Sequence, residues 1–333
     1  MSVSDRDGEI FSASPIISCN TFDSCNKNQN DGAYLSDVSS RDRPWDKHRA
    51  NADIVSRHYR HGGMDRYADQ VTFCSQILDF KLTPHLDSGE LRLKLASAQF
   101  CRVRHCPVCQ WRRSLRWRAK AFEALPLVVE TYPKHRWLFL TLTVKNCLLT
   151  DLKETLGHIN YSFKKLTKRK NFPGLGWIKS VEVTRGKDGK TAHPHLHILM
   201  MVNPSYFKSG YLSQQKWCNL WQDCLKVDYQ PVLDVQAVKP DKSPTSLLTE
   251  VIKYQTKESD LIHDPFWFAE YVKQMQGTRA IAIGGCLKDY FKALEQEPED
   301  LIGKGEDEES EVDEGHLYFG WKKQEKKYKL VNQ

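Results

Sequence analysis

The sequence predicts an α+β protein built around an antiparallel sheet with helices on one face. Two observations support this class. From residue 136 onward, strand-like and helix-like segments follow in the order β-α-β-β-α-β, which is the ferredoxin-like plan. Ahead of them lies a helical region with a hairpin pattern and a cluster of cysteines, which predicts a small separate element.

Each element of the sheet region is predicted from its local pattern. Strands appear as short apolar or alternating runs, such as "WLFLTLTV" at 137–144, and helices repeat apolar residues every three or four positions. The predicted strands are 136–144, 176–184, 193–202 and 231–238, and the predicted helices are 150–170, 211–226 and 244–258. Residues 261–294 add a helical pattern around "RAIAIGG".

The chain divides into four regions. Residues 1–43, rich in Ser, Asn and Asp, are predicted to be disordered. Residues 44–125 hold a helical pattern at 43–71, a hairpin with its turn at 87–89, and the cysteine cluster. Residues 126–294 hold the sheet, and 295–333 form an acidic linker and a basic tail with a hairpin pattern.

The charge distribution favours a nucleic-acid partner. The chain of 333 residues carries a net charge of +7, but residues 295–314 hold eleven acids against one lysine, which leaves +17 on the rest. A solvated surface with no polyanion partner is the alternative. The longest apolar runs are too short to cross a membrane and the N-terminus lacks a signal-peptide pattern, so we expect a cytoplasmic protein with no membrane partner.

The cysteine cluster predicts a structural zinc site. Cys101, Cys106 and Cys109 lie in "CRVRHCPVC", and the two-residue gap of the CPVC knuckle lets both thiolates face one ion. The fourth ligand is either Cys74, which we favour, or His105. Reduced thiols without a metal are the alternative.

A cationic segment surrounds this knuckle. Residues 101–120 hold seven Arg or Lys residues and no acid, and the helix that follows the knuckle has an apolar face formed partly by Trp111 and Leu115. We therefore expect a DNA-docking element in which arginines contact phosphates. The candidate DNA-binding residues are Arg102, Arg104, Arg112, Arg113, Arg116 and Arg118.

Three alternating histidines predict a second metal site. His193, His195 and His197 share one face of a strand, and an antiparallel hairpin with its turn at 186–190 carries Glu182 back beside them. Imidazoles and a carboxylate suit Mn²⁺ or Mg²⁺ with positions left open for phosphate oxygens. Histidines that are merely hydrogen-bonded on a half-exposed strand are the alternative.

A third pattern aligns three chemically active side chains. Within the predicted helix 244–258, Glu250, Tyr254 and Lys257 fall at positions i, i+4 and i+7, on one stripe. A tyrosine attacks a phosphate only when that phosphate is polarised and the phenolate charge is stabilised, and Lys257 could supply the second condition. An amphipathic surface helix explains the same pattern when it is taken alone.

Together these motifs resemble the rolling-circle plasmid replication initiators, in the single-tyrosine-plus-glutamate branch of the HUH endonucleases. The resemblance rests on four segments and covers about residues 43–294. The segments are "FLTLTVKN" (139–146), "HPHLHIL" (193–199), "EVIKYQTKESD" (250–260) and "FCRVRHCPVCQWRRS" (100–114), the last with Cys74 upstream.

The resemblance implies a ferredoxin/RRM-like HUH endonuclease fold and a nick in one strand of a plasmid origin. Tyr254 would join the 5′ phosphate and leave a 3′ OH primer, with host helicase and polymerase as further partners. His195, His197 and Glu182 would hold the metal, with His193 as a ligand or a supporting residue.

The glutamate implies how the reaction ends. Glu250 stands one turn before the nucleophile and would activate water in the second, terminating cleavage. An HUH transposase or relaxase, or a non-catalytic zinc-containing DNA-binding regulator, are the competing hypotheses.

Overall fold

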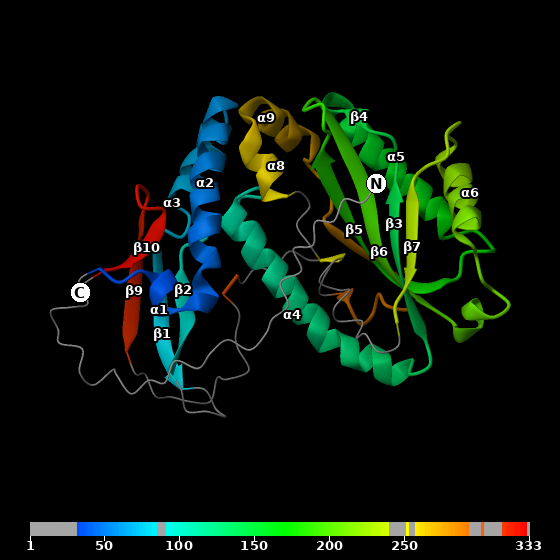
Figure 1. Cartoon of the computed structure of the whole chain (residues 1–333), viewed down its shortest axis with the longest axis horizontal. Helices are drawn as coiled ribbons and strands as arrows, with labels where there is room; N and C mark the ends of the chain where they lie inside the picture. Colours follow the sequence, from blue (N-terminus) through cyan, green and yellow to red (C-terminus); the bar gives the residue numbers. More distant parts are fainter. Residues whose placement is uncertain are drawn as a thin grey trace, which may run out of the picture.

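The computed structural model describes residues 32–84, 91–239, 251–252, 257–292, 301–302 and 315–331. Two lobes lie side by side, joined by the long helix α4 (Pro107–Thr131) that runs diagonally from one lobe beneath the other (Figure 1). Pro107 at its first position suits a helix start, because proline lacks only an N–H that would have no partner there. This helix crosses residue 125, where the predicted boundary between the regions was placed.

The first lobe combines helices near the N-terminus with a four-stranded antiparallel sheet in the order β10-β9-β1-β2. Its helical elements are α1 (Leu35–Val38), η2 (Ser40–Asp42), α2 (Pro44–His61) and α3 (Asp65–Phe73). Its strands are β1 (Ile77–Pro84), β2 (Leu91–Ala98), β9 (His316–Lys322) and β10 (Lys327–Leu330).

This lobe corrects two predictions about the chain ends. Residues 32–43 were predicted to be disordered, but Leu35 is fully buried there and Tyr34 bridges to Lys329. The predicted C-terminal hairpin is present, yet it is part of the first lobe, because β9 pairs with β1. The remaining residues of both predicted end regions, 1–31, 293–300, 303–314 and 332–333, lie outside the described residues.

The second lobe confirms the predicted order of strands and helices. Its antiparallel sheet runs β7-β3-β6-β5-β8, with the short β4 (Cys147–Leu148) paired to β6. The long strands are β3 (Arg136–Thr143), β5 (Gly174–Arg185), β6 (Thr191–Val202) and β7 (Leu233–Ala237). The connecting helical elements are η3 (Leu149–Asp151), α5 (Leu152–Leu166), η4 (Pro204–Phe207) and α6 (Gln214–Leu225).

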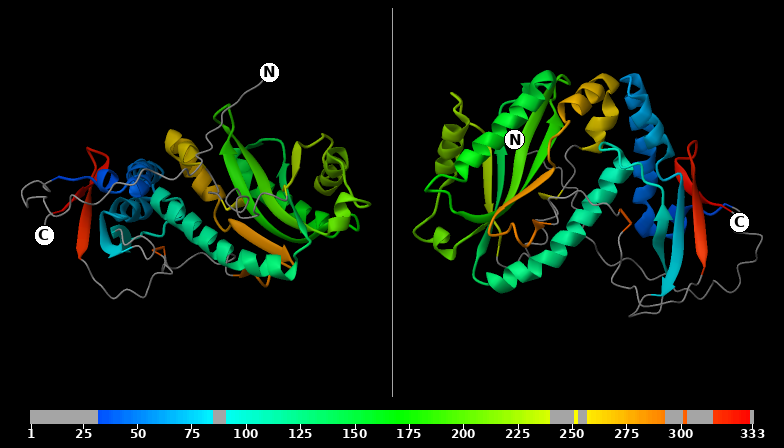
Figure 2. Two further views of the ribbon diagram at one scale, coloured as in Figure 1. Left: turned by 60° about the horizontal axis from the view of Figure 1, so that its bottom comes forward. Right: turned by 180° about the vertical axis from the view of Figure 1, so that it is seen from behind.

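The segment after residue 257 differs from the prediction. Two short helices, α8 (Glu258–His263) and α9 (Pro265–Gln274), pack on α2 of the first lobe (Figure 2). The "RAIAIGG" segment is the edge strand β8 (Ile281–Gly285), not a helix. Its residues alternate, so that Ile281 and Ile283 are buried on one side, which is the period of a strand.

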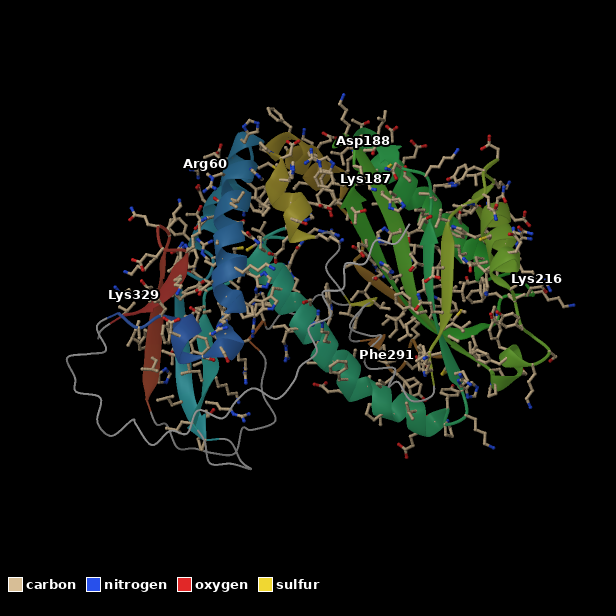
Figure 3. The ribbon with its side chains drawn as sticks, in the orientation of Figure 1. Arg60, Lys187, Asp188, Lys216, Phe291 and Lys329 are labelled. Atoms are coloured by element: carbon tan, nitrogen blue, oxygen red, sulfur yellow. The ribbon has the colours of Figure 1, made fainter. Side chains whose placement is uncertain are left out.

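The two faces of the second sheet are covered differently. On one face, leucines of β3 and alternate residues of β6 form a core with α5 and α6. On the other face, Leu199 and Met201 pack with α4 and with Phe291, which lies between that helix and the sheet in Figure 3. Among the described residues, this second cover packs on Leu199 and Met201, and the histidines lie further along the same face of β6.

Candidate metal centres

The β5–β6 hairpin brings Glu182 and the histidines together as the sequence predicted. Its tip, where Lys187 and Asp188 stand in Figure 3, is stabilised by Asp188, whose carboxylate accepts hydrogen bonds from the N–H groups of Lys190 and Thr191. Strand register then places Glu182 directly opposite His195. Side chains directly opposite in an antiparallel pair are the closest cross-strand neighbours.

Glu182, His195 and His197 form a compact group of metal-ligand atoms. The Glu182 Oε2 atom lies 2.8 Å from Nε2 of His197 and 3.3 Å from Nε2 of His195. The three ligand atoms all lie within 4.8 Å of one another. His193 lies outside this group, with its ring centroid 5.3 Å from that of His195.

The imidazoles are oriented by contacts on their other ring nitrogens. Nδ1 of His197 lies 3.2 Å from Oγ1 of Thr141, on the neighbouring strand β3, and Nδ1 of His195 lies 3.3 Å from the His193 carbonyl. These contacts leave both Nε2 atoms directed at Glu182. Such supporting hydrogen bonds are typical of metal-ligating histidines.

The electrostatics of the group favour an ionised carboxylate beside the two imidazoles. Burial acts to raise the pKa of Glu182, but hydrogen bonds with His195 and His197 outweigh it and hold that pKa well below its usual range. Burial, with the neighbouring His195, lowers the pKa of His193. Two imidazoles and one carboxylate are a donor set that fits a divalent cation and leaves coordination positions open.

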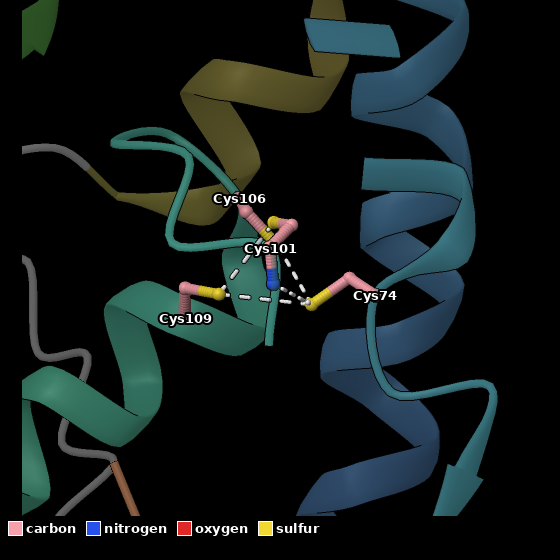
Figure 4. Close-up of side chains that lie close together, drawn as sticks. All are labelled: Cys74, Cys101, Cys106 and Cys109. Atoms are coloured by element: carbon pink, nitrogen blue, oxygen red, sulfur yellow. Dashed lines mark hydrogen bonds between the residues drawn. The ribbon is translucent and has the colours of Figure 1, made fainter. Parts of the chain in front are cut away.

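The four cysteines form a second group, which decides between the two predicted fourth ligands. Sγ of Cys74, at the end of α3, lies 3.6 Å from Sγ of Cys109 and 3.7 Å from that of Cys106 (Figure 4). The Sγ atoms of Cys101 and Cys109 are also 3.6 Å apart. A tetrahedral ion with metal–sulfur bonds of about 2.3 Å separates its sulfurs by about 3.8 Å, so the group fits zinc.

His105 has a different environment from the cysteines. Its ring is buried against Tyr271, with the centroids 5.2 Å apart, and burial lowers its pKa to about 3. It therefore packs in the core as a neutral residue. The predicted preference for Cys74 agrees with this arrangement.

Arg104, Arg112 and Arg113 among the predicted DNA-binding residues donate hydrogen bonds to carbonyls of the protein itself. Arg113 is only 5% exposed and donates to the carbonyls of Arg102 and Arg104, which ties down the knuckle loop. Its predicted phosphate contact is wrong, because a guanidinium this deeply buried and engaged does not reach a backbone phosphate. Of the other predicted residues, Arg102 is exposed, and Arg116 and Arg118 on α4 are half-buried.

Two further arginines hold distant segments against the knuckle. Arg112 donates to the carbonyls of Leu301 and Ile302, both at 2.8 Å, and its guanidinium lies over the Trp45 ring. Arg104 donates to the Thr278 carbonyl at 2.6 Å and to the Thr278 hydroxyl at 2.9 Å. These contacts give Arg104 and Arg112 a structural role near the knuckle that does not require DNA.

The tyrosine motif falls mostly outside the described residues. Glu250 and Tyr254 both lie there, so the alignment of their side chains stays a prediction. Lys257 is described, and the predicted helix through it is wrong at this end: its backbone is extended, with φ −62° and ψ 138°, and it precedes α8. Lys257 therefore does not continue a helical stripe from Glu250.

The start of α8 is held by contacts that sequence patterns did not suggest. Glu258 is 9% exposed and its carboxylate pairs with His48 Nδ1 and accepts from Asn51 Nδ2 at 2.7 Å. Two residues later, Asp260 accepts from the Arg185 N–H at 3.0 Å, at the end of β5. The His48–Glu258 pair spans 210 residues, so no local pattern could have indicated it.

Fold and site together define an α+β protein with a four-cysteine cluster and a histidine–glutamate group competent to hold a divalent cation. Across the part of the chain that the structure describes, every helix is too short or too polar to span a lipid bilayer. The model of a family described as replication protein matches residues 92–329, and the chain belongs to this family.

Curated relatives agree over most of the chain. A protein described as "Protein rep" from Lentilactobacillus hilgardii is 33% identical over 84% of this chain and 92% of its own length. Another from Lactiplantibacillus plantarum is 36% identical over 80% and 87%, and one from Bacillus amyloliquefaciens is 31% identical over 86% and 94%. No solved structure matches. The resemblance to plasmid replication initiators is confirmed.

Proposed function

We propose that the chain initiates rolling-circle plasmid replication as an HUH endonuclease that nicks one strand of its double-strand origin. The observation that carries the proposal is the Glu182–His195–His197 group, set on one face of the second sheet in a member of the replication protein family. Nucleases use such groups to bring a divalent cation against the phosphate that is attacked.

In the proposed reaction, the Tyr254 hydroxyl attacks the scissile phosphate. The new bond joins the phenolic oxygen to phosphorus, the bond from phosphorus to the 3′ oxygen breaks, and that oxygen takes up a proton to become the primer. A tyrosine hydroxyl, with an ordinary pKa near 10, needs its charge stabilised, a role we assign to Lys257. The phosphodiester energy stays in the phosphotyrosine link, so no ATP is required.

The metal would be held by His195, His197 and Glu182, with His193 as a supporting residue. When bound, Mn²⁺ or Mg²⁺ would withdraw electron density from the scissile phosphate. Thr141 would keep the His197 ring in the orientation that ligation requires, since it already contacts Nδ1.

The described residues on either side of the tyrosine support its assignment. Ile252 is buried in the cluster of Leu199 and Met201, on the face of the sheet that carries the histidines. On the other side, α8 is tied to the end of β5 through Asp260 and Arg185. Only four residues separate Ile252 from Lys257. Because a chain extends at most about 3.6 Å per residue, the segment between these two described positions is short, which supports a tyrosine near the histidine face.

We assign termination to Glu250. Its carboxylate would activate water for the second cleavage, which releases the protein instead of transferring it. Glu250→Ala should then nick at the wild-type rate and terminate poorly, measured as multimeric single strands in a replication assay. A variant that fails to nick would contradict this role.

The cysteine element would supply origin binding. The Cys74, Cys101, Cys106 and Cys109 group would hold structural Zn²⁺ and thereby fix the start of α4. Arg102, Arg116 and Arg118 remain the candidates for phosphate contacts from this element. A host helicase would unwind the duplex and a host polymerase would extend the primer. With these partners, the protein would act in the cytoplasm.

A nicking assay tests the proposal. Supercoiled plasmid with the cognate origin, incubated with the protein and Mn²⁺ or Mg²⁺, should yield nicked circles with protein on the 5′ end. A chelator should abolish the reaction. His197→Ala should bind the origin without nicking, and His158→Ala, an exposed residue on α5, should behave as wild type. Absence of both nicked circles and linked protein would contradict the proposal.

A further inference from the structure

A cavity lies on the sheet face opposite the histidines. Its volume is about 470 Å³, and it lies among α5, β5 and the loop between α9 and β8. Its polar and charged lining residues are Lys153, Asn160, Lys179, Gln276, Thr278 and Arg279. Because side chains alternate along a strand, Lys179 points away from the face that carries Glu182. Nothing in the proposed nicking reaction uses this cavity.

Lys179 is a buried cation at the base of this cavity. Its side chain is part of a residue only 8% exposed, its Nζ donates to Oδ1 of Asn160, and it lies 5.2 Å from the Phe163 ring centroid. Burial lowers its pKa to about 8. An ammonium carries three donors, and one amide oxygen does not replace the hydration that a buried charge has lost.

The rim adds positive charge and no compensating acid. Lys153 and Arg279 are exposed and line the cavity together with Lys179. Among the described residues that line it, none is Asp or Glu. Three cations facing one space of ligand size are an arrangement that attracts an anion of high charge density.

The depth of the site favours a small ligand over a DNA strand. The phosphates of a polymer lie between neighbouring nucleotides, whereas Lys179 is 8% exposed and lines a pocket within the size range of small-molecule sites. The terminal phosphates of a small molecule can enter to that depth. Leu156 and Val181 provide apolar walls on which its remainder can rest.

We propose that this cavity binds a small phosphate-bearing molecule, such as pyrophosphate or the phosphate tail of a nucleotide. Its phosphates lie between Lys179 at the base and Lys153 and Arg279 at the rim. The loop that closes the cavity includes Thr278, which accepts two hydrogen bonds from Arg104 of the cysteine element. The ligand therefore contacts a loop that the first lobe also holds.

Calorimetric titration of the full chain with pyrophosphate, and separately with a nucleoside triphosphate, tests the proposal in metal-free buffer. We expect saturable binding with one ligand per chain and a Kd below roughly 1 mM. Lys179→Met should weaken binding at least about ten-fold, and Arg279→Gln, on the exposed rim, several-fold. Lys216→Met, on the surface of α6 (Figure 3), is the control and should bind as wild type.

Three results would overturn the proposal. The first is no saturable binding of either probe by the wild-type chain. The second is undiminished binding by both Lys179→Met and Arg279→Gln. The third is that a single-stranded oligonucleotide displaces pyrophosphate and that Lys179→Met weakens the binding of both equally. The cavity would then be a contact for the DNA backbone. Arg279→Gln lies outside the core and keeps the test valid if Lys179→Met folds poorly.

Discussion

At the scale of single residues, Glu182 determines what the histidine strand can do. His195 and His197 are separated by one residue and would remain a pair of imidazoles without the carboxylate that lies against both. The pairing of β5 with β6 supplies this third ligand, and Thr141 on β3 fixes one of the rings. Two neighbouring strands thus supply the ligands, and a third orients one of them.

The cysteine group gives a residue-scale prediction. Cys74→Ser should bind markedly less zinc than one ion per chain and lower the Tm, because a serine hydroxyl is a poor zinc ligand and structural zinc contributes to folding free energy. Elemental analysis and thermal unfolding measure the two effects. Cys147→Ser, a half-buried cysteine outside the group, is the control. Full zinc content in Cys74→Ser, with loss in His105→Ala, would show that His105 is the ligand.

The buried Lys179 gives a pH-dependent prediction. Burial lowers the pKa of Lys179 from 10.5 to about 8 in the folded state. Below pH 8 the lysine is charged in both states, and the buried charge destabilises the folded chain. This cost falls as pH rises from 8 to 10.5, because the folded chain then holds a neutral lysine. The cost is at most roughly 3 kcal/mol. Lys179→Met should therefore raise the Tm at pH 7, and the gain should shrink as pH approaches 10.5.

Thermal unfolding in ligand-free buffer at both pH values measures this effect. Lys216→Met, an exposed lysine, should leave the Tm unchanged throughout. A gain for Lys179→Met that is equal at pH 7 and at pH 10.5 would contradict the assignment of the cost to charge.

At the scale of elements, the sequence predicted the strands and helices whose apolar spacing can be recognised within one continuous segment. Strands β3, β5 and β6 alternate strictly between two different covers, and α5 and α6 repeat apolar residues with helical spacing. Strand β8 was missed because Ala282 and Gly284 give its second face no polar residue, so the alternation is hidden. The end of the predicted helix 244–258 was wrong because α8 begins separately, at an anchor formed by distant residues.

That anchor gives an element-scale prediction. Glu258 fixes the start of α8 on α2 through His48 and Asn51, directly after the tyrosine motif. Glu258→Gln removes the charge with little change in shape, and we expect slower nicking by several-fold at saturating Mn²⁺. The affinities for Mn²⁺ and origin DNA should not change, since the ligands and the first lobe's exposed arginines are untouched.

Single-turnover nicking and calorimetry separate these effects. Glu130→Gln, at the exposed end of α4, is the matched control. A wild-type nicking rate in Glu258→Gln would show that the anchor does not position the nucleophile. A parallel fall in Mn²⁺ affinity would indicate a general loss of structure.

At the scale of the whole molecule, segments from early and late in the sequence form one lobe. Strand β9 covers β1, Trp321 donates to Asp53 Oδ2 at 2.9 Å, and Tyr328 donates to the Ser75 carbonyl at 2.6 Å, beside Cys74. The sequence alone indicated a hairpin here but not its partner, because the paired residues are about 240 positions apart. The tail is thus part of the structure around the cysteine group.

The lobes are also connected through the knuckle loop. Arg104 holds Thr278 and Arg112 holds the segment at 301–302, while α4 extends under the second sheet. Arg104, which composition alone assigns to DNA, therefore helps to join the lobes. This arrangement would let origin binding by the first lobe present one strand to the histidine face of the second.

Mapping the covalent link tests the central claim most directly. After nicking of origin plasmid with Mn²⁺ and digestion of protein and DNA, mass spectrometry should find the tryptic peptide that contains Tyr254 with a nucleotide attached through its 5′ phosphate. Tyr254→Phe should bind the origin and form no link. A nucleotide on another residue, or undiminished nicking by Tyr254→Phe, would contradict the account.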